Sequence, residues 1–249
     1  MNKSSIFEHL IELRTRLMWS ALVFVTTFAV AYIFKNEIYS FLVEPLAAAY
    51  HGEERRMIFT GLTEAFFTYI KLGMFAAFIV SFPFIAAQLY IFLAPGLYKK
   101  ERKMLMPFVI ISPILFWLGA AFVYYFIMPL AMEFFLSFES PATQSKLPIE
   151  LEARVSEYLS FVMQMIIGFG LAFQLPVILI LLGKIGVLKV EYLQRNRRFA
   201  VIIIFVAAAI LTPPDVISQT GLALVLMALY ELSIFFIKRL NNARHKIHS

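Results

Sequence analysis

The chain has 249 residues, of which 61% are hydrophobic and only 15% are charged, and its formal net charge is +6. Soluble domains have about 45–50% apolar and about 25% charged residues, so this composition indicates a membrane protein with several spans. The chain has no cysteine, which excludes disulfides, thiolate nucleophiles and cysteine-based metal sites.

The first apolar run covers residues 17–34 and follows a polar segment that carries Lys3, Arg14 and Arg16. It predicts a first membrane span with its N-terminal side in the cytoplasm. Because further apolar runs follow, we interpret it as an uncleaved anchor and not as a signal peptide.

The segment 35–64 is rich in glutamate, and we expect it outside the cytoplasm. Some of its apolar residues have helical spacing and predict an amphipathic helix that caps the bundle at the outer interface: Ile38, Phe41, Leu42 and Leu46.

Later apolar runs predict further spans at about 66–94, 105–128, 156–182, 199–212 and 216–237. The run at 199–212 has only 14 residues, about 21 Å as a helix, before Pro213 and Pro214 force a turn. It predicts a short hairpin that thins the membrane. The alternative, a re-entrant segment, would place the C-terminus outside.

The charge distribution favours the hairpin. With six spans, the predicted cytoplasmic side holds 16 Lys and Arg residues and the outer side four. The positive-inside rule then predicts an all-α polytopic membrane protein, one membrane domain over residues 1–249, with both termini cytoplasmic.

Motifs for ATP binding or hydrolytic chemistry are absent from the sequence. It contains no G-x-x-x-x-G-K, H-E-x-x-H or G-x-S-x-G. We therefore expect neither an enzyme nor a cofactor or metal site, and any transport must draw its energy from elsewhere.

One predicted cytoplasmic loop, at 92–102, reads FLAPGLYKKER. Pro95 and Gly96 end a helix there, and Glu101 is a carboxylate among four basic residues. The other acidic residues on this side are Glu8, Glu12, Glu191 and Glu231. Glu8 and Glu191 are interpreted as local ion-pair partners.

Five stretches of the sequence resemble the TatC subunit of the twin-arginine protein translocase. They are HLIELRTRL at 9–17, LTEAFFTYIK at 62–71, FLAPGLYKKER at 92–102, FGLAFQLPV at 169–177 and TPPDVISQ at 212–219. The resemblance covers nearly the whole chain in order.

This resemblance implies six helices in a concave bundle, the last two short, in the bacterial cytoplasmic (inner) membrane, although an organelle-encoded copy is an alternative source. It implies a receptor for twin-arginine signal peptides of folded proteins, working with the proton-motive force. The implied partners are TatA-type and TatB-type single-span subunits, further copies of the chain, and membrane lipid, with no nucleic acid.

The resemblance makes Glu12 and Glu101 the candidates for binding the paired arginines. A planar guanidinium donates two parallel hydrogen bonds to a carboxylate, which a lysine ammonium does not reproduce. Other residues of the implied site would orient these acids or shape the loop: Arg14, Phe92, Pro95, Leu97, Tyr98 and Arg102.

Four further residues have either a partner-docking or a structural role. The common family pattern has Glu where this sequence has Gln174, so a titrating proton is not expected there. Gln174 either docks a partner helix or caps backbone freed by Pro176. Asp215 and Thr212 belong to the turn of the short hairpin, and Pro45 to the outer cap.

Two other classes of protein remain open at this point. A secondary transporter of a small solute would need a polar cluster at mid-membrane, for which only Gln164 and Gln174 are available. A membrane-anchored assembly factor would share the topology without needing the carboxylates at 12 and 101.

Overall fold

The computed structural model describes residues 3–51, 55–93, 99–140, 147, 149–212 and 215–248, with side chains outside 3–6, 8–9, 93, 99–105 and 240–248. In chain order the elements are α1 (Lys3–Ile33), α2 (Lys35–Ala49), α3 (Glu64–Leu93), α4 (Lys99–Phe122), the π-helix η2 (Val123–Ile127), α5 (Met128–Leu136), α6 (Val155–Ala172), α7 (Leu175–Lys184), α8 (Val190–Arg195), α9 (Arg197–Leu211) and α10 (Val216–His248). The described chain contains two isolated β-bridges and no strand, so the predicted all-α fold is confirmed.

Five stretches among the described residues are long and apolar enough to cross a membrane: Leu10–Ile33, Glu64–Phe92, Met106–Leu136, Val155–Lys184 and Val216–Arg239. α9 is apolar but has only 15 residues, about 22 Å at 1.5 Å per residue. A hydrocarbon core is about 30 Å thick, so the crossing predicted at 199–212 stays a prediction.

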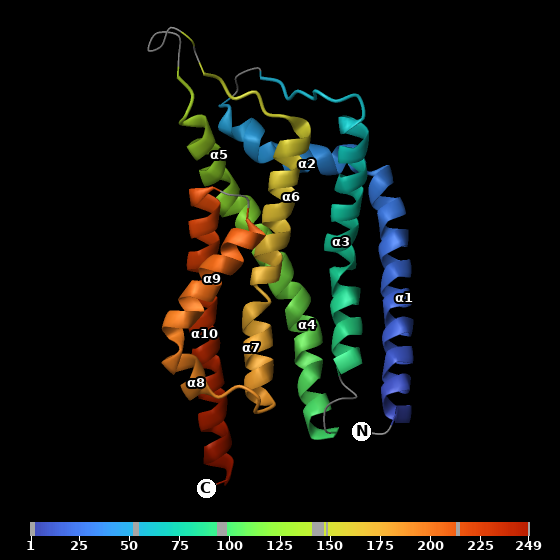
Figure 1. Ribbon diagram of the computed structural model, residues 1–249, viewed down its shortest axis with the longest axis vertical. Coiled ribbons are helices and arrows are strands. Elements are labelled where there is room, and N and C mark those ends of the chain that lie inside the picture. Colours follow the sequence, from blue (N-terminus) through green and yellow to red (C-terminus); the bar gives the residue numbers. More distant parts are fainter. Residues whose placement is uncertain are drawn as a thin grey trace.

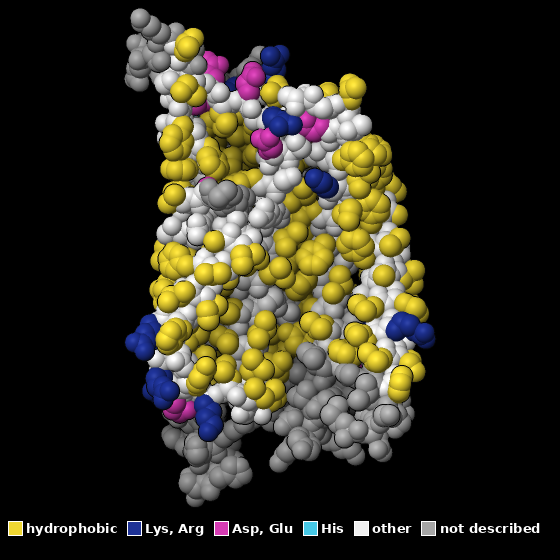
Figure 2. All heavy atoms as spheres, in the orientation of Figure 1, with side chains coloured by type: hydrophobic (Ala, Val, Ile, Leu, Met, Phe, Trp, Pro, Cys, Tyr) yellow, Lys and Arg dark blue, Asp and Glu magenta, His cyan; other side chains and the backbone are white. Residues whose placement is uncertain are grey.

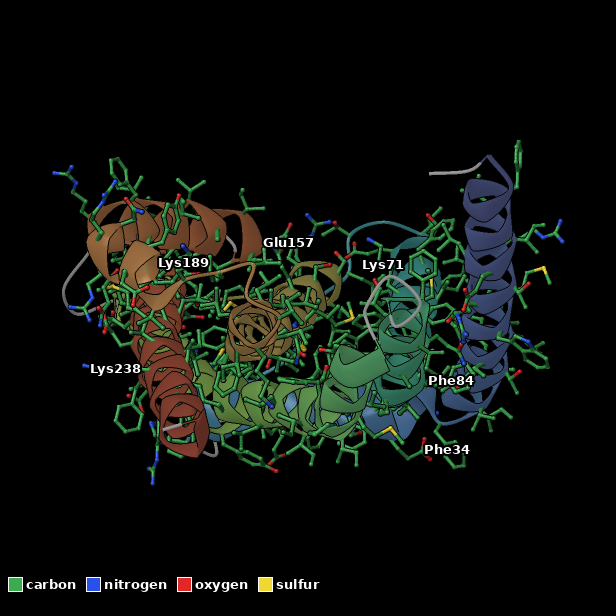
Figure 3. The ribbon with its side chains drawn as sticks, turned by 90° about the horizontal axis from the view of Figure 1, so that it is seen from below. Phe34, Lys71, Phe84, Glu157, Lys189 and Lys238 are labelled. Atoms are coloured by element: carbon green, nitrogen blue, oxygen red, sulfur yellow. The ribbon has the colours of Figure 1, made fainter. Side chains whose placement is uncertain are left out.

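The helices form an open arc around α6 (Figures 1 and 3). α1 stands at one edge and packs extensively on α3, and α8, α9 and α10 form the other edge. α1 begins and α10 ends at the same end of the bundle, which we call the terminal end (Figure 1). The arc agrees with the concave bundle that the sequence resemblance implies.

The opposite end, here called the cap end, is closed by α2, which lies across the tops of α3 and α6 (Figure 1). Leu42, Pro45 and Leu46 are the buried face of α2. This is the amphipathic cap that the sequence predicts. Figure 2 shows hydrophobic side chains over most of one face of the bundle, with charged side chains gathered mainly near the two ends.

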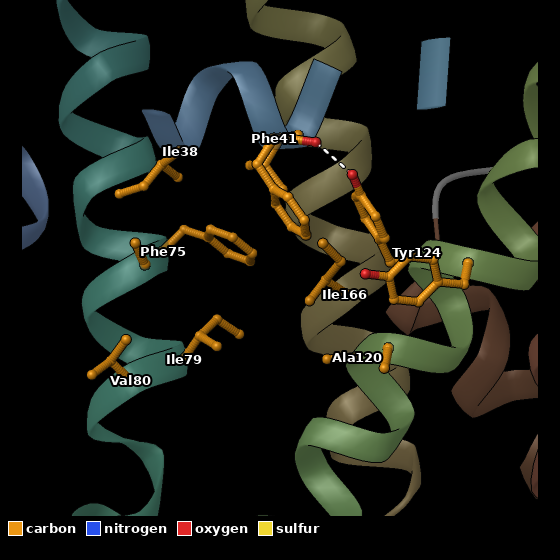
Figure 4. Close-up of a pocket in the computed structure, with 12 residues that line it drawn as sticks. Ile38, Phe41, Phe75, Ile79, Val80, Ala120, Tyr124 and Ile166 are labelled. Atoms are coloured by element: carbon orange, nitrogen blue, oxygen red, sulfur yellow. Dashed lines mark hydrogen bonds between the residues drawn. The ribbon is translucent and has the colours of Figure 1, made fainter. Parts of the chain in front are cut away.

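An apolar groove of about 350 Å³ lies beneath the cap, between α3 and the α4–η2 segment (Figure 4). Its roof is fixed by the Tyr124 hydroxyl, which donates to the Phe41 carbonyl at 2.6 Å, and by stacking of the two rings at 4.4 Å. Ala76, Ala120 and Ala121 leave the groove hollow because their side chains are short.

The third predicted span does not end at residue 128. The helix continues past Pro129 to Leu136, through the π-helical turn at Val123–Ile127. Proline lacks an N–H and its ring crowds the carbonyl four residues earlier, here that of Tyr125. In the π-helical turn before it, the Met128 N–H donates to the Val123 carbonyl, five residues earlier. This wider turn accommodates the proline, so the helix continues.

The fourth predicted span, 156–182, is interrupted. α6 ends at Ala172 and α7 begins at Leu175, so Phe173 and Gln174 lie between two helices. Pro176 sits in the first turn of α7, where its missing N–H costs no helical hydrogen bond. Hydropathy alone therefore predicts the span but not its break.

Candidate functional site

The N-terminal part of α1 carries an ion pair on one helical face. Arg16 donates to Oε1 of Glu12 through Nε at 3.0 Å and through Nη2 at 2.7 Å. Residues four apart in a helix lie on the same face, and α1 is helical from Lys3, so the pair follows from local geometry. The side chains are 30% exposed for Glu12 and 24% exposed for Arg16.

A residue from α3 completes this arrangement. Nη1 of Arg16 donates to Oε1 of Gln88 at 3.0 Å, which ties α1 to α3. The group lines a cavity of about 540 Å³ that is walled by Thr15, Trp19 and Phe84. Figure 3 shows Phe84 between α3 and α1. A carboxylate therefore lies in a pocket with polar groups and two aromatic walls near the terminal end.

Arg14, which the resemblance implies would help to orient the acids, is not the arginine that pairs with Glu12 in the structure. It is exposed and lines a different surface hollow with Leu10 and Leu17. Residues two apart in a helix point in different directions, so Arg16, four residues from Glu12, takes that position. The i,i+4 spacing was a sufficient signal for Arg16. Gln88, 72 residues away, has no such signal.

The other expected members of this site are placed only in part. Glu101 and Arg102 lie in the first turn of α4, and their side chains are outside the described residues. Pro95, Leu97 and Tyr98 also lie outside the described residues. Phe92 is half-buried at the end of α3. α4 and α1 both begin at the terminal end of the bundle (Figure 1).

Gln174 forms a buried bridge between α7 and α4. The Ser112 hydroxyl donates to its Oε1 at 2.5 Å, and its Nε2 donates to the Ser112 carbonyl at 3.0 Å. Gln174 is 9% exposed and Ser112 2% exposed. The amide is thus paired with another helix of the same chain, and neither bond goes to backbone that Pro176 leaves free.

The turn between α9 and α10 is held by its own polar side chains. Asp215 accepts a hydrogen bond from the Ser218 N–H at 2.7 Å, which is an N-cap of α10. The Thr212 hydroxyl donates to the Ala208 carbonyl at 2.9 Å at the end of α9. Pro45 is buried in the α2 cap. These contacts support structural roles for the three residues.

The sequence analysis assigns no role to Glu64, which joins two segments at the cap end. Its carboxylate accepts hydrogen bonds from the Thr60 N–H at 2.9 Å, the Ser156 hydroxyl at 2.6 Å and the Arg154 guanidinium at 3.2 Å. Residues 58 and 154 also pair as an isolated parallel bridge. Glu64 therefore fixes the start of α3 to the start of α6.

The Glu12 pocket has the chemistry of a binding site. Among the described residues, no group of three or more His, Asp or Glu side chains is placed to hold a metal ion. The Glu12 pocket combines a carboxylate, an amide oxygen and aromatic side chains, which suits a cationic ligand with apolar neighbours.

Comparison with known proteins places the chain among membrane translocase subunits. The family model described as "Sec-independent protein translocase protein (TatC)" matches residues 8–224. The Sec-independent protein translocase protein TatC of Rickettsia prowazekii is 49% identical, over 98% of this chain and 96% of its own length. TatC of Escherichia coli K12 is 36% identical, over 93% of this chain and 87% of its own.

A solved structure agrees with these relatives. A crystal structure described as the twin arginine translocase receptor TatC in DDM superposes with a TM-score of 0.79 at 36% identity, covering 92% of this chain and 98% of that one. Fold, spans and sequence together define a polytopic subunit of a protein translocase, a class that is not enzymatic. The chain belongs to the TatC family.

Proposed function

We propose that this protein is the receptor of its translocase for twin-arginine signal peptides, and that Glu12 and Glu101 bind the two arginines. The supporting observation is the Glu12 pocket, where the carboxylate already binds a guanidinium, that of Arg16. The same chemistry would hold an arginine supplied by a peptide.

Affinity and selectivity come from different parts of the peptide. An exposed ion pair contributes about 0–1 kcal/mol, so two such pairs distinguish arginine from lysine more than they hold the peptide. Burial of apolar surface contributes about 25 cal/mol per Å². The apolar segment of the signal peptide therefore supplies most of the binding free energy by lying along the bundle.

The topology belongs to the same proposal. Six spans, including the short α9, place both termini in the cytoplasm and the terminal end of the bundle at the cytoplasmic face of a bacterial inner membrane. The 16 basic residues predicted on this side support that orientation. Glu12 and Glu101 would then face the compartment from which a folded precursor arrives, and the proton-motive force would drive transport.

Single-span subunits of the TatA and TatB types, and further copies of this chain, are the proposed partners within the lipid bilayer. α9 supports this proposal because one of its faces is unpacked, with Ile202, Ile203, Val206 and Ile210 between 55% and 73% exposed. A short helix with an apolar lateral face gives a partner helix a place to pack.

Peptide binding tests the proposal. A folded Glu101→Gln variant should lose binding of a twin-arginine signal peptide, and Glu12→Gln should weaken it, because an amide forms no ion pair with the guanidinium. Fluorescence anisotropy of a labelled peptide in detergent measures both effects.

The control is Glu191→Gln, which removes an exposed carboxylate of α8 and should leave binding unchanged. Unchanged binding in Glu101→Gln would refute the assignment. Crosslinking of a twin-arginine precursor to residues 92–102 would separate the receptor from a solute transporter or an assembly factor, since neither alternative predicts it.

A further inference from the structure

The carboxylate of Glu12 is occupied before any peptide arrives. Arg16 directs two nitrogens, Nε and Nη2, at the single oxygen Oε1 of Glu12. Its third nitrogen, Nη1, is bonded to Gln88. All three nitrogens of this guanidinium therefore have acceptors inside the cavity that Glu12 lines.

This contact conflicts with the way a second arginine would bind. A guanidinium forms its strongest contact with a carboxylate by placing two parallel hydrogen bonds on the two oxygens. With Oε1 taken by Arg16, that two-oxygen contact is blocked. A second guanidinium beside the first would also meet a like charge at short range, which disfavours binding.

Arg16 keeps one of its hydrogen-bond partners when it leaves Glu12. Gln88 Oε1 accepts from Nη1 at 3.0 Å and belongs to α3, so it stays in place when the Glu12 contact breaks. The adjoining cavity of about 540 Å³ leaves room for the side chain to turn and for an incoming group to enter. Breaking the ion pair thus does not leave Arg16 without an acceptor.

We infer that Arg16 is an internal competitor for Glu12, which an arginine of the signal peptide must displace. The inference rests on the proposed function. Its effect is to lower the affinity for every ligand that needs Glu12 by one common factor, the factor by which the Arg16 contact is favoured. Discrimination between arginine and lysine then stays with the carboxylates, since both kinds of peptide must displace the same side chain.

The test compares Arg16→Gln and Arg16→Lys with the unmodified protein, using a twin-arginine peptide and a matched twin-lysine peptide. An ion pair as exposed as Glu12–Arg16 corresponds to about a two- to fivefold effect on Kd. Arg16→Gln should therefore bind both peptides more tightly by that factor, and the ratio of the two Kd values should not change. Arg16→Lys keeps the positive charge but loses the planar guanidinium that donates several hydrogen bonds at once. This variant should therefore bind both peptides with intermediate affinity.

A double variant isolates the contact. In a Glu12→Gln background, the gain in affinity from Arg16→Gln should be much smaller, because there is no carboxylate left to compete for and only the repulsion by the Arg16 charge remains. Arg195→Gln removes one exposed positive charge from α8 and is the control for general electrostatics. Its effect should be smaller than that of Arg16→Gln. Thermal unfolding checks that each variant is folded, and Arg16→Lys carries the test if Arg16→Gln is not.

Equal or weaker peptide binding by folded Arg16→Gln would overturn the inference and make Arg16 a positioning residue for Glu12. The inference would also be overturned if Arg16→Gln raised the peptide affinity by the same factor in the Glu12→Gln background. Failure of the proposed function looks different: the unmodified protein would not bind the peptide, or Glu12→Gln and Glu101→Gln would both leave binding unchanged.

Discussion

Gln174 and Ser112 hydrogen-bond to each other at a place where both side chains are buried. The two hydrogen bonds, at 2.5 and 3.0 Å, join α7 to α4 directly beside the break between α6 and α7. A neutral amide suits this site because it both donates and accepts, whereas an ionised carboxylate only accepts. The residue is therefore part of the packing of the bundle.

Replacement of Gln174 by Leu should lower the free energy of unfolding by about 1–3 kcal/mol, because the buried Ser112 groups lose their partner. The lower end applies if the Ser112 hydroxyl turns to a carbonyl of its own helix. Thermal unfolding in detergent measures the change. Gln164→Leu makes the same substitution at an exposed position of α6 and should leave stability nearly unchanged. Peptide binding should persist in both variants.

The contacts of Arg16 show which side-chain partners could be predicted from the sequence and which could not. The resemblance gives Arg14 a part in orienting the acids, and the structure pairs Glu12 with Arg16 because helical spacing decides the contact. Gln88 and Ser112 carry no signal in the sequence. Each becomes meaningful only when a helix far along the chain brings it to its partner, at sequence separations of 72 and 62 residues.

At the level of elements, the helices of the bundle are held together by close packing and not by the hydrophobic effect. Lipid is as apolar as the side chains, so helices in a membrane associate by packing around small residues. A Cβ at Gly119 of α4 would lie 2.6 Å from the carbonyl oxygen of Phe169 in α6, and one at Gly170 would lie 2.6 Å from the Phe116 ring. These glycines set the distance between α4 and α6.

Gly119→Ala should therefore destabilise the bundle by about 1–3 kcal/mol, because the new methyl group meets backbone that does not give way. Gly221→Ala is the matched control, since its Cβ would make an ordinary 3.4 Å contact with Ile127. Unfolding followed by tryptophan fluorescence compares the two. A Gly119→Ala variant as stable as the control would show that α4 and α6 are free to separate.

Hydropathy predicts where the apolar stretches lie and misses how the backbone runs inside them. The spans expected at 66–94 and 216–237 coincide closely with the apolar parts of α3 and α10. The continuation past Pro129 depends on a π-helical turn, and the break at Phe173–Gln174 depends on packing against α4. Neither feature changes the mean hydropathy of the surrounding residues, so a hydropathy plot does not reveal either one.

For the molecule as a whole, charged contacts at the cap end join segments that the membrane spans separate. Arg55 forms an ion pair with Glu139, and its Nη2 donates to Oε2 at 3.1 Å. Glu139 also accepts from the Leu151 N–H at 2.8 Å. Together with the Arg154–Glu64 pair, these bonds tie the segment after α2 to the segment between α5 and α6.

This tie should be sensitive to acid. Hydrogen bonds from Arg55 lower the pKa of Glu139 below its ordinary value, so the folded state holds that proton less tightly than the unfolded chain. The contribution to stability is then complete above the unfolded pKa of about 4.3 and is lost as the pH falls through the lower folded pKa.

Arg55→Gln removes the cause of this shift. The melting temperature of the variant should fall below that of the unmodified protein at pH 7, and the difference should narrow as the pH drops below about 4. Arg56→Gln is the control, because Arg56 is 84% exposed on its side chain and lies 4.0 Å from Glu152. A difference between Arg55→Gln and the unmodified protein that does not change with pH would contradict the linkage.

The position of α1 at the edge of the arc has a mechanical consequence for Glu12. α1 packs extensively on α3, and only 6% of its apolar window is buried. Nearer the cap end, the Phe28 ring lies 3.0 Å from the place of a Cβ on Gly73. Toward the terminal end, the Arg16–Gln88 bond joins α1 to α3 without involving Glu12. A ligand that takes the Glu12 carboxylate would therefore leave α1 tied to α3, so the carboxylate opens without the two helices separating.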